Sequence, residues 1–182
     1  MTTTIAFLGP AGTFTEAAVH KFAAHMPEVE TMPVGSPSEA VAAVRAEQAE
    51  YACVAIENSV DGAVTTTFDA LVEGEPVQIY REVDIPVAFS IMTRPDAEDI
   101  KRLSTHPVAF QQIRGWVKEH LPEVEFVPAS SNAAAAEAVA RGEADAAAAP
   151  ARAVEIFGLE TIAQGVADIK GAATRFVLVG RP

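Results

Sequence analysis

The first 56 residues alternate short apolar runs with signals for helix starts, and this alternation constrains the fold more than any other feature. Apolar runs at residues 5–8 and 51–56 read as buried strands. Between them, Thr13 and Ser36 are each followed three residues later by a glutamate, the pattern of a helix that begins with a capping box. This order of strands and helices predicts an α/β protein with mostly parallel sheets. Ligands of such sheets bind beyond the carboxyl ends of the strands.

The last strand of the chain carries the clearest polar signal. Residues 176–179 form a continuous apolar run, which is typical of a strand buried on both faces. Thr174 and Arg175 come directly before it. A guanidinium is costly at a buried position unless it meets a carboxylate or reaches water. Two interpretations therefore stay open: Arg175 extends to solvent, or it binds an anion beside the Thr174 hydroxyl in a cleft.

The chain is expected to form two lobes, because two extended segments read as strands that cross between them. These segments lie near residues 80–90 and 160–170. Lobe 1 would comprise residues 1–82 and 167–182, and lobe 2 residues 83–166. Two crossing strands predict an interlobe cleft, the kind of place where small molecules bind, and a hinge that permits closure.

Charge and composition exclude several classes of function. A net charge of −12 over 182 residues, without a long basic cluster, argues against nucleic acid and anionic membrane surfaces as partners. The single cysteine, Cys53, cannot form an intrachain disulfide and suits a reducing compartment. The four histidines lack metal-ligand spacing, so we expect no metal and no cofactor. With no secretory signal and no apolar stretch of membrane-spanning length, a cytoplasmic location is expected.

Two helices of the second lobe are expected to offer their N-termini to an anion. The helices that begin at His106 and Ser131 have no acid in their first turns, whereas Glu16 and Glu39 occupy the first turns in lobe 1. Free N–H groups at a helix N-terminus attract anions, and Arg175 adds a cation able to bind a carboxylate with two parallel hydrogen bonds. The combination suits a small dicarboxylate. Phosphate is disfavoured, because no phosphate-loop pattern occurs.

Five stretches in the right order resemble the catalytic domain of the prephenate dehydratase family. They are residues 9–18 (GPAGTFTEAA), 56–64 (IENSVDGAV), 105–107 (THP), Ser131 with its alanine run, and 174–176 (TRF). The resemblance covers essentially the whole chain. It implies a two-lobed fold like that of type II periplasmic binding proteins, conversion of prephenate to phenylpyruvate, and a homodimer formed through the catalytic domains. The regulatory ACT domain that normally follows lies outside this sequence; if 182 residues is the natural length, feedback by phenylalanine through that domain is absent.

The resemblance also implies roles for individual residues. Thr174 would donate a hydrogen bond to the departing hydroxyl group; we assign Arg175 to a substrate carboxylate and Phe176 to the packing that holds both in place. Thr13 is also expected to cap a helix, and Asn58 to close a turn at the end of a strand. Substrate contacts are expected at Thr13, Asn58, Ser59, Gly62, His106, Ser131 and Asn132.

The chain departs from the family pattern at four places, and two other functions stay open. Ala63 stands where the family usually has serine, Val108 where it has glutamine or histidine, and Asn132 where it has threonine. The family also commonly has an asparagine at or near residues 169–172, where this chain has none. One alternative is a relative of secondary metabolism that decarboxylates prephenate without aromatising it. The other is a module that binds a small anion without catalysis. The intact Thr-Arg-Phe and Glu-Asn-Ser signatures favour dehydration.

Overall fold

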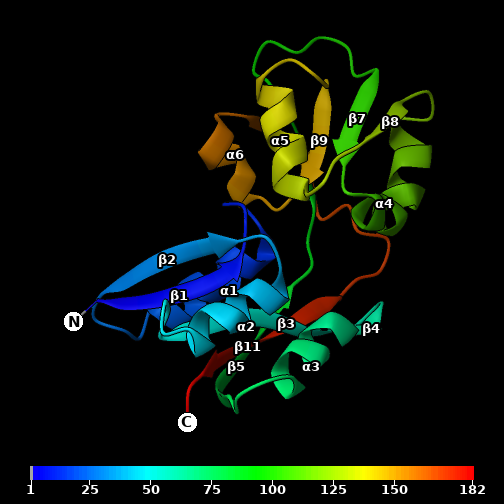
Figure 1. Cartoon of the computed structure of the whole chain (residues 1–182). Helices are drawn as coiled ribbons and strands as arrows, with labels where there is room; N and C mark the ends of the chain where they lie inside the picture. Colours follow the sequence, from blue (N-terminus) through cyan, green and yellow to red (C-terminus); the bar gives the residue numbers. More distant parts are fainter. Residues whose placement is uncertain (1) are drawn as a thin grey trace. The chain divides into compact units, whose positions relative to one another are not determined.

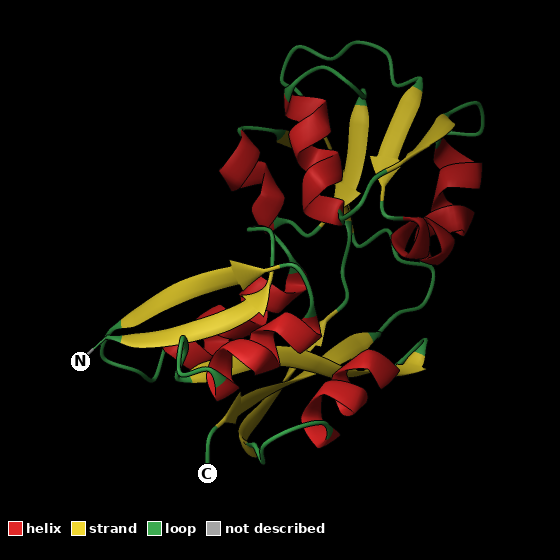
Figure 2. Ribbon diagram, in the orientation of Figure 1, coloured by secondary structure: helices red, strands yellow, loops and turns green. Residues whose placement is uncertain are grey.

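A computed structural model describes residues 2–182. The chain divides into two compact units. Unit 1 runs to Pro86 and resumes from Ala172 to Pro182, and unit 2 comprises Val87–Gly171. The boundaries between the units, after Pro86 and after Gly171, thus lie a few residues later than the boundaries expected from the sequence, after residues 82 and 166. Figure 2 shows the strands gathered into two sheets, each accompanied by helices.

Unit 1 is built on a six-stranded sheet of order β2-β1-β3-β11-β5, with β4 paired to β3. Strand β1 is parallel to β2 and β3, whereas β11 is antiparallel to both of its neighbours, β3 and β5. The strands are β1 (Thr3–Leu8), β2 (Val29–Val34), β3 (Tyr51–Asn58), β4 (Gly62–Ala63), β5 (Gln78–Pro86) and β11 (Ala173–Gly180), and the helices are α1 (Phe14–Ala23), α2 (Pro37–Arg45) and α3 (Thr65–Val72).

The two faces of this sheet are covered by different helices. On one face, Phe176 and Leu178 of β11 pack with residues of α1. On the other, Val177 and Val179 pack with residues of α2 and α3. Successive side chains of a strand point to opposite faces, so all four are buried, each contributing about 1.5–3 kcal/mol relative to exposure. The prediction of a strand buried on both faces is confirmed.

The α/β class is confirmed, but the sheets are mixed rather than mostly parallel. The chain leaves unit 1 from the end of β5 and returns at the start of β11, and Pro86 is paired with Ala173 in the sheet. Thr174 in turn is paired with Asn58, the last residue of β3. Strand β11 therefore begins where β3 ends and must run in the opposite direction.

Unit 2 contains a five-stranded sheet of order β10-β6-β9-β7-β8 (Figure 1). Strand β7 is parallel to β8 and β9, and β6 is antiparallel to β9 and β10. Helices α4 and α5 follow β7 and β8, so both begin beyond the carboxyl ends of paired parallel strands. The elements are β6 (Ser90–Thr93), β7 (Arg102–Thr105), α4 (Pro107–His120), β8 (Glu125–Pro128), α5 (Asn132–Ala140), β9 (Ala146–Ala149), α6 (Arg152–Phe157) and β10 (Glu160–Gln164).

The strands expected to cross between the lobes near residues 80–90 and 160–170 do not cross: β5 ends at Pro86 in the unit 1 sheet, and β10 lies in the unit 2 sheet. Strand β7, which begins at Arg102 and lies inside the sheet of unit 2, has no clear signal in the sequence. Strand β7 is four residues long, and such a short run has no period that separates a strand from a turn. Its pairing with β8 and β9 decides its conformation.

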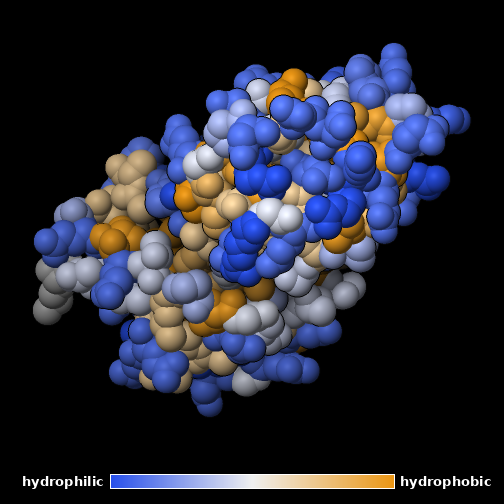
Figure 3. Space-filling view, turned by 90° about the horizontal axis from the view of Figure 1, so that it is seen from above, coloured by the Kyte–Doolittle hydropathy of each residue, from blue (hydrophilic) through white to orange (hydrophobic). Residues whose placement is uncertain are grey.

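Hydrophilic residues cover much of the face shown in Figure 3, with hydrophobic residues between them. The longest helix, α4, has 14 residues, and within residues 2–182 no helix combines the length and apolar character needed to cross a membrane.

Asp145 fastens the start of β7. Its Oδ2 atom accepts hydrogen bonds from the N–H groups of Lys101 at 3.1 Å and Arg102 at 2.8 Å, and the Arg102 guanidinium lies 3.5 Å from Oδ1. Burial acts to raise the pKa of Asp145, but the hydrogen bonds and the Arg102 charge together outweigh it and hold the pKa below its usual value of 3.8.

We predict that Asp145→Asn lowers the free energy of unfolding by about 1–2 kcal/mol near pH 7, because the amide accepts these hydrogen bonds less strongly than the carboxylate. A depressed pKa in the folded state means that this stabilisation is present above the usual pKa and is lost as pH falls through the folded-state pKa. Denaturant unfolding from pH 7 down to pH 2 should show the difference between wild type and variant shrinking. Asp99→Asn, at an exposed position, is the control. A difference that does not change with pH would contradict the charge-based account.

Candidate active site

The residues expected at the site divide between the two units. Within each unit, the structure brings several of them together. Unit 1 holds Thr13, Asn58, Ser59, Gly62, Thr174, Arg175 and Phe176, and unit 2 holds His106, Ser131 and Asn132.

Asn58 and Thr174 are joined across β3 and β11. The Nδ2 atom of Asn58 donates to Thr174 Oγ1 at 3.0 Å, and Asn58 Oδ1 accepts from the N–H of Val60 at 2.8 Å. The turn closed by this second bond fixes which end of the amide faces Thr174. Because an amide nitrogen can only donate, the Thr174 oxygen accepts, and its own O–H hydrogen stays available for another acceptor. At 8% exposure, Thr174 is thus a nearly buried, oriented hydroxyl donor.

Ser59 fixes the main chain directly before Thr174. Its N–H donates to the Ala173 carbonyl at 2.9 Å, and its Oγ accepts from the Ala173 N–H at 2.9 Å. Gly62 closes the turn after Ser59 and pairs with Asn58. Its φ of 83° lies in the left-handed region, and a Cβ there would meet nothing within 4 Å. The main-chain conformation, rather than space, therefore favours glycine at this position.

Thr13 is the N-cap residue of α1. Its side chain accepts from the Glu16 N–H at 3.2 Å, and Glu16 Oε2 accepts from the Gly12 N–H at 2.6 Å. Thr13 therefore caps α1 as predicted, while the Glu16 side chain binds the N–H of the residue before the N-cap. Since the Thr13 oxygen is an acceptor here, its hydroxyl hydrogen can still be donated to a ligand. Capping and substrate contact are therefore compatible at this residue.

Thr174 and Arg175 point to opposite faces of the sheet. Ile85 is paired with Thr174, and both Ile85 and Phe176 belong to the core against α1, which places Thr174 on the α1 face. Arg175 lies on the other face by the alternation of the strand. There its Nε donates to Asp84 Oδ1 at 3.1 Å. The hydroxyl of Thr174 and the guanidinium of Arg175 are therefore separated by the sheet, although the two residues are adjacent in the sequence.

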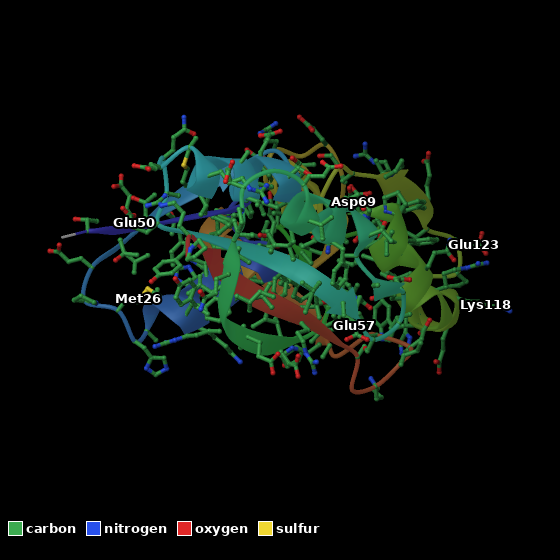
Figure 4. All side chains as sticks on the ribbon, turned by 60° about the horizontal axis from the view of Figure 1, so that its bottom comes forward. Met26, Glu50, Glu57, Asp69, Lys118 and Glu123 are labelled. Atoms are coloured by element: carbon green, nitrogen blue, oxygen red, sulfur yellow. The ribbon has the colours of Figure 1, made fainter. Side chains whose placement is uncertain are left out.

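Three carboxylates surround the Arg175 guanidinium. The hydrogen bond and charge of Asp84, with smaller contributions from Glu82 and Glu57, raise the pKa of Arg175. Figure 4 shows Glu57 at the end of β3 beside β11. The side chain is 43% exposed, so it both meets a carboxylate and reaches water. A hollow of about 240 Å³ here is lined by Glu57, Ser59, Asp84, Ala173 and Arg175.

The sequence left open whether Arg175 reaches solvent or binds an anion, and it did not identify Asp84 as the partner. Glu82 and Asp84 stand two residues apart in an extended segment, which places both on one face of a strand. That spacing was the available signal. It could not show that this strand lies beside β11, because the pairing joins residues about 90 positions apart.

In unit 2, Asn132 joins the starts of α4 and α5. Its Oδ1 atom accepts from the main-chain N–H of His106 at 3.2 Å. His106 Nδ1 caps α4 by accepting from the Val108 N–H at 3.2 Å, and Ser131 Oγ caps α5 by accepting from the Ala134 N–H at 2.9 Å. Neither helix has an acid in its first turn, as predicted.

These caps leave part of the two helix starts open to a ligand. They use the N–H groups of Val108 and Ala134, and neither cap uses those of Asn132 and Ala133 at the start of α5. With the positive ends of two helix dipoles close together, the arrangement is suited to a carboxylate. No group of three or more acids, histidines or cysteines that could hold a metal ion occurs among residues 2–182.

The family model described as prephenate dehydratase matches residues 5–182. The chain belongs to the prephenate dehydratase family. The prephenate dehydratase of Corynebacterium glutamicum is 54% identical, over 97% of this chain and 58% of its own length. That of Mycolicibacterium vanbaalenii is 48% identical, over 98% of this chain and 62% of its own. The chain therefore spans about three fifths of the length of the curated relatives it matches.

Solved structures share this fold. The prephenate dehydratase of Arthrobacter aurescens, in complex with L-Phe, is 42% identical with a TM-score of 0.90, over 99% of this chain and 61% of that one. GqqA, described as a novel type of quorum quenching acylases, is 32% identical with a TM-score of 0.82, over 98% of this chain and 64% of that one. These likenesses confirm the α/β fold of the family expected from the sequence.

We predict that Ser59→Ala loosens the start of β11, because the Ala173 N–H loses its acceptor. Unfolding free energy should fall by about 0.5–1.5 kcal/mol, and hydrogen exchange at the Ala173 amide should become faster. Exchange measured by mass spectrometry or NMR tests this. Ser38→Ala, at an exposed position on α2, should leave exchange at Ala173 unchanged. Equal protection of Ala173 in both variants would show that Ser59 does not hold the strand.

Proposed function

We propose that the chain catalyses the decarboxylating dehydration of prephenate to phenylpyruvate and is a carbon–oxygen lyase of phenylalanine biosynthesis. Membership of the family over residues 5–182 supports this. The single observation that carries the proposal is the hydrogen bond from Asn58 to Thr174. It orients the Thr174 oxygen as an acceptor and leaves the hydroxyl hydrogen for a departing group.

The chemistry of prephenate explains why one oriented hydroxyl is enough. Prephenate carries two carboxylates and a ring hydroxyl, and loss of carbon dioxide and hydroxide makes the ring aromatic. Aromatisation drives the reaction, so the protein has to orient the dianion and assist the departing hydroxide. A threonine hydroxyl is a weak acid, so Thr174 acts as a positioned donor. Assistance of this kind is worth about 10²–10⁴ in rate, or about 3–5 kcal/mol.

For a substrate carboxylate we propose two candidate sets of donors, each argued within its own unit. In unit 1, Asp84 holds Arg175 through Nε, and the two terminal nitrogens of the guanidinium can still bind a carboxylate. The nearby acids oppose this role. In unit 2, the open N–H groups at the start of α5, with the Asn132 side chain beside them, form the second set. Phe176 is buried in the core, and we propose that it fixes the strand that carries Thr174.

The product formed by the purified chain tests the proposal. Incubation with prephenate should yield phenylpyruvate, followed by its absorbance in alkali. A non-aromatic keto acid as the only product would instead indicate a decarboxylase, and tight binding without turnover would indicate a binding module.

Amide hydrolysis is the chemistry of an acylase such as the similar GqqA. Cys53 is an unsuitable nucleophile for it, because burial strongly raises the pKa of its thiol.

We predict that Thr174→Val lowers kcat by about 10²–10⁴-fold with little change in KM, because it removes the donor to the leaving group while keeping the shape of the side chain. Steady-state kinetics with prephenate measures this. Thr174→Ser, which keeps the hydroxyl, should retain much of the rate. Thr31→Val, on the exposed side of β2, is the matched control. Near-normal turnover by Thr174→Val would remove Thr174 from the mechanism.

The role of Arg175 is tested by comparing Arg175→Lys with Asp84→Asn. If Arg175 binds a substrate carboxylate, Arg175→Lys should raise KM about 10-fold or more, because a lysine cannot form the two parallel hydrogen bonds. Asp84→Asn should then leave KM equal or lower, since it removes a competing anion. If Arg175 serves only as the partner of Asp84, both variants should change KM and kcat alike, which would contradict the binding role.

We also propose a homodimer and a cytoplasmic location, as the family resemblance implies. Strand β5 is at the edge of its sheet and exposes Ile79 and Tyr80, which gives this edge an apolar surface suited to a second copy. Light scattering coupled to size-exclusion chromatography would give the mass in solution, and a monomer at micromolar concentration would contradict the dimer.

A further inference from the structure

Asp168 fastens the segment after β10 to the middle of α4. Its main-chain N–H donates to the Gln112 carbonyl at 2.7 Å. Its Oδ2 atom accepts from the N–H of Gly115 at 2.8 Å, and its Oδ1 atom from the N–H of Trp116 at 3.2 Å. We call these three hydrogen bonds the Asp168 latch. In Figure 1 the orange-red segment that carries Asp168 runs next to α4.

The latch is unusual because it uses N–H groups inside a helix. Main-chain N–H groups there ordinarily donate to the carbonyl four residues earlier. A carboxylate that also accepts from two of them competes with the helix's own bonds, and the ribbon of α4 changes direction part-way along its length in Figure 2. Bends of this kind occur where a side chain inserts into the ladder of helix hydrogen bonds. Asp168 therefore acts on the shape of α4 as well as on its own segment.

Gly115 is the position that allows this approach. A Cβ added at Gly115 would lie 2.8 Å from Asp168 Oδ1, a distance that forces the carboxylate away. Glycine inside a helix is destabilising relative to alanine, and this contact accounts for its presence in α4. Gly115 and Asp168 are thus matched to each other across 53 positions of sequence.

The latch lies close in sequence to the proposed donor of the reaction. Ser59 holds Ala173, the residue before Thr174, by two hydrogen bonds. Only residues 169–172 connect the latch to this second attachment, and Gly171 among them has a φ of 77°. Lys170 Nζ donates to the Gly165 carbonyl at 2.6 Å, which closes the loop around the latch. The chain entering β11 is therefore short and held at both ends.

We propose that Asp168 is a positioning residue for the dehydration, with Gly115 as its matched partner. By holding the chain just before β11, the latch limits the motion of residues 169–173 and so of the Thr174 hydroxyl. The inference rests on the proposed function. Displacement of a reacting group by about 1 Å can cost on the order of 10²-fold in rate. Loss of the latch should therefore slow the reaction even though every group that touches the substrate is still present.

A double-mutant cycle tests the match between the two residues. Asp168→Ala should make hydrogen exchange at residues 171–174 about 10-fold faster and should lower kcat about 10-fold, while KM changes less than about 3-fold. Gly115→Ala should have the same effects in the wild-type background. In the Asp168→Ala background it should have little effect or increase stability, because alanine then meets no carboxylate. Asp99→Ala, an exposed acid of unit 2, is the control.

The only tryptophan of the chain provides a readout that does not depend on turnover. The main-chain N–H of Trp116 donates to Asp168, and the indole ring is stacked on His120 with 4.5 Å between centroids. Its fluorescence should therefore change in Asp168→Ala and in Asp168→Asn, with far-UV circular dichroism unchanged. Asp168→Asn keeps one acceptor oxygen and should give intermediate exchange rates and kcat.

The outcomes separate the two proposals. Absence of phenylpyruvate from the wild-type chain would refute the proposed function, and faster exchange at residues 171–174 in Asp168→Ala would still support the latch. Unchanged exchange at these residues would overturn the latch whatever the activity. Unchanged kcat in Asp168→Ala, or additive effects of the two substitutions, would overturn the positioning role.

Discussion

The pairing of β11 between β3 and β5 is the interaction on which unit 1 depends. The last strand of the chain lies between two strands formed before residue 87, and its side chains supply both layers of core. Its apolar residues are buried on both faces, so the strand cannot be removed without exposing α1, α2 and α3 together. Thr174 and Asn58 meet where this pairing begins. The stability of the sheet and the orientation of the proposed donor therefore have the same origin.

The alternation of β11 has a chemical consequence. It sends Thr174 to the face covered by α1 and Arg175 to a face with the acids Asp84, Glu82 and Glu57. A chain with a net charge of −12 gives no long-range attraction to a dianion, so attraction has to be local. In unit 2 the starts of α4 and α5 provide positive potential without an acid in either first turn. Neutral main-chain donors thus carry much of the proposed anion binding.

One departure from the family pattern has a structural use. Asn132 stands where the family usually has threonine, and its Oδ1 accepts from the His106 N–H. The amide thereby links the starts of two helices. At two other departures, Ala63 and Val108, the side chains are exposed, and the structure shows no contact that requires these residues.

Features that depend on neighbours within about four residues could be predicted from the sequence. The helix N-caps at Thr13 and Ser36 formed as expected, the acid-free helix starts were recognisable, and the Thr-Arg-Phe stretch indicated the family. The direction of β11, the short strand β7, the acids around Arg175 and the latch of Asp168 on Gly115 depended on the tertiary structure. Each of these features joins residues tens of positions apart. The local sequence pattern does not show which distant residues will be neighbours in the folded chain.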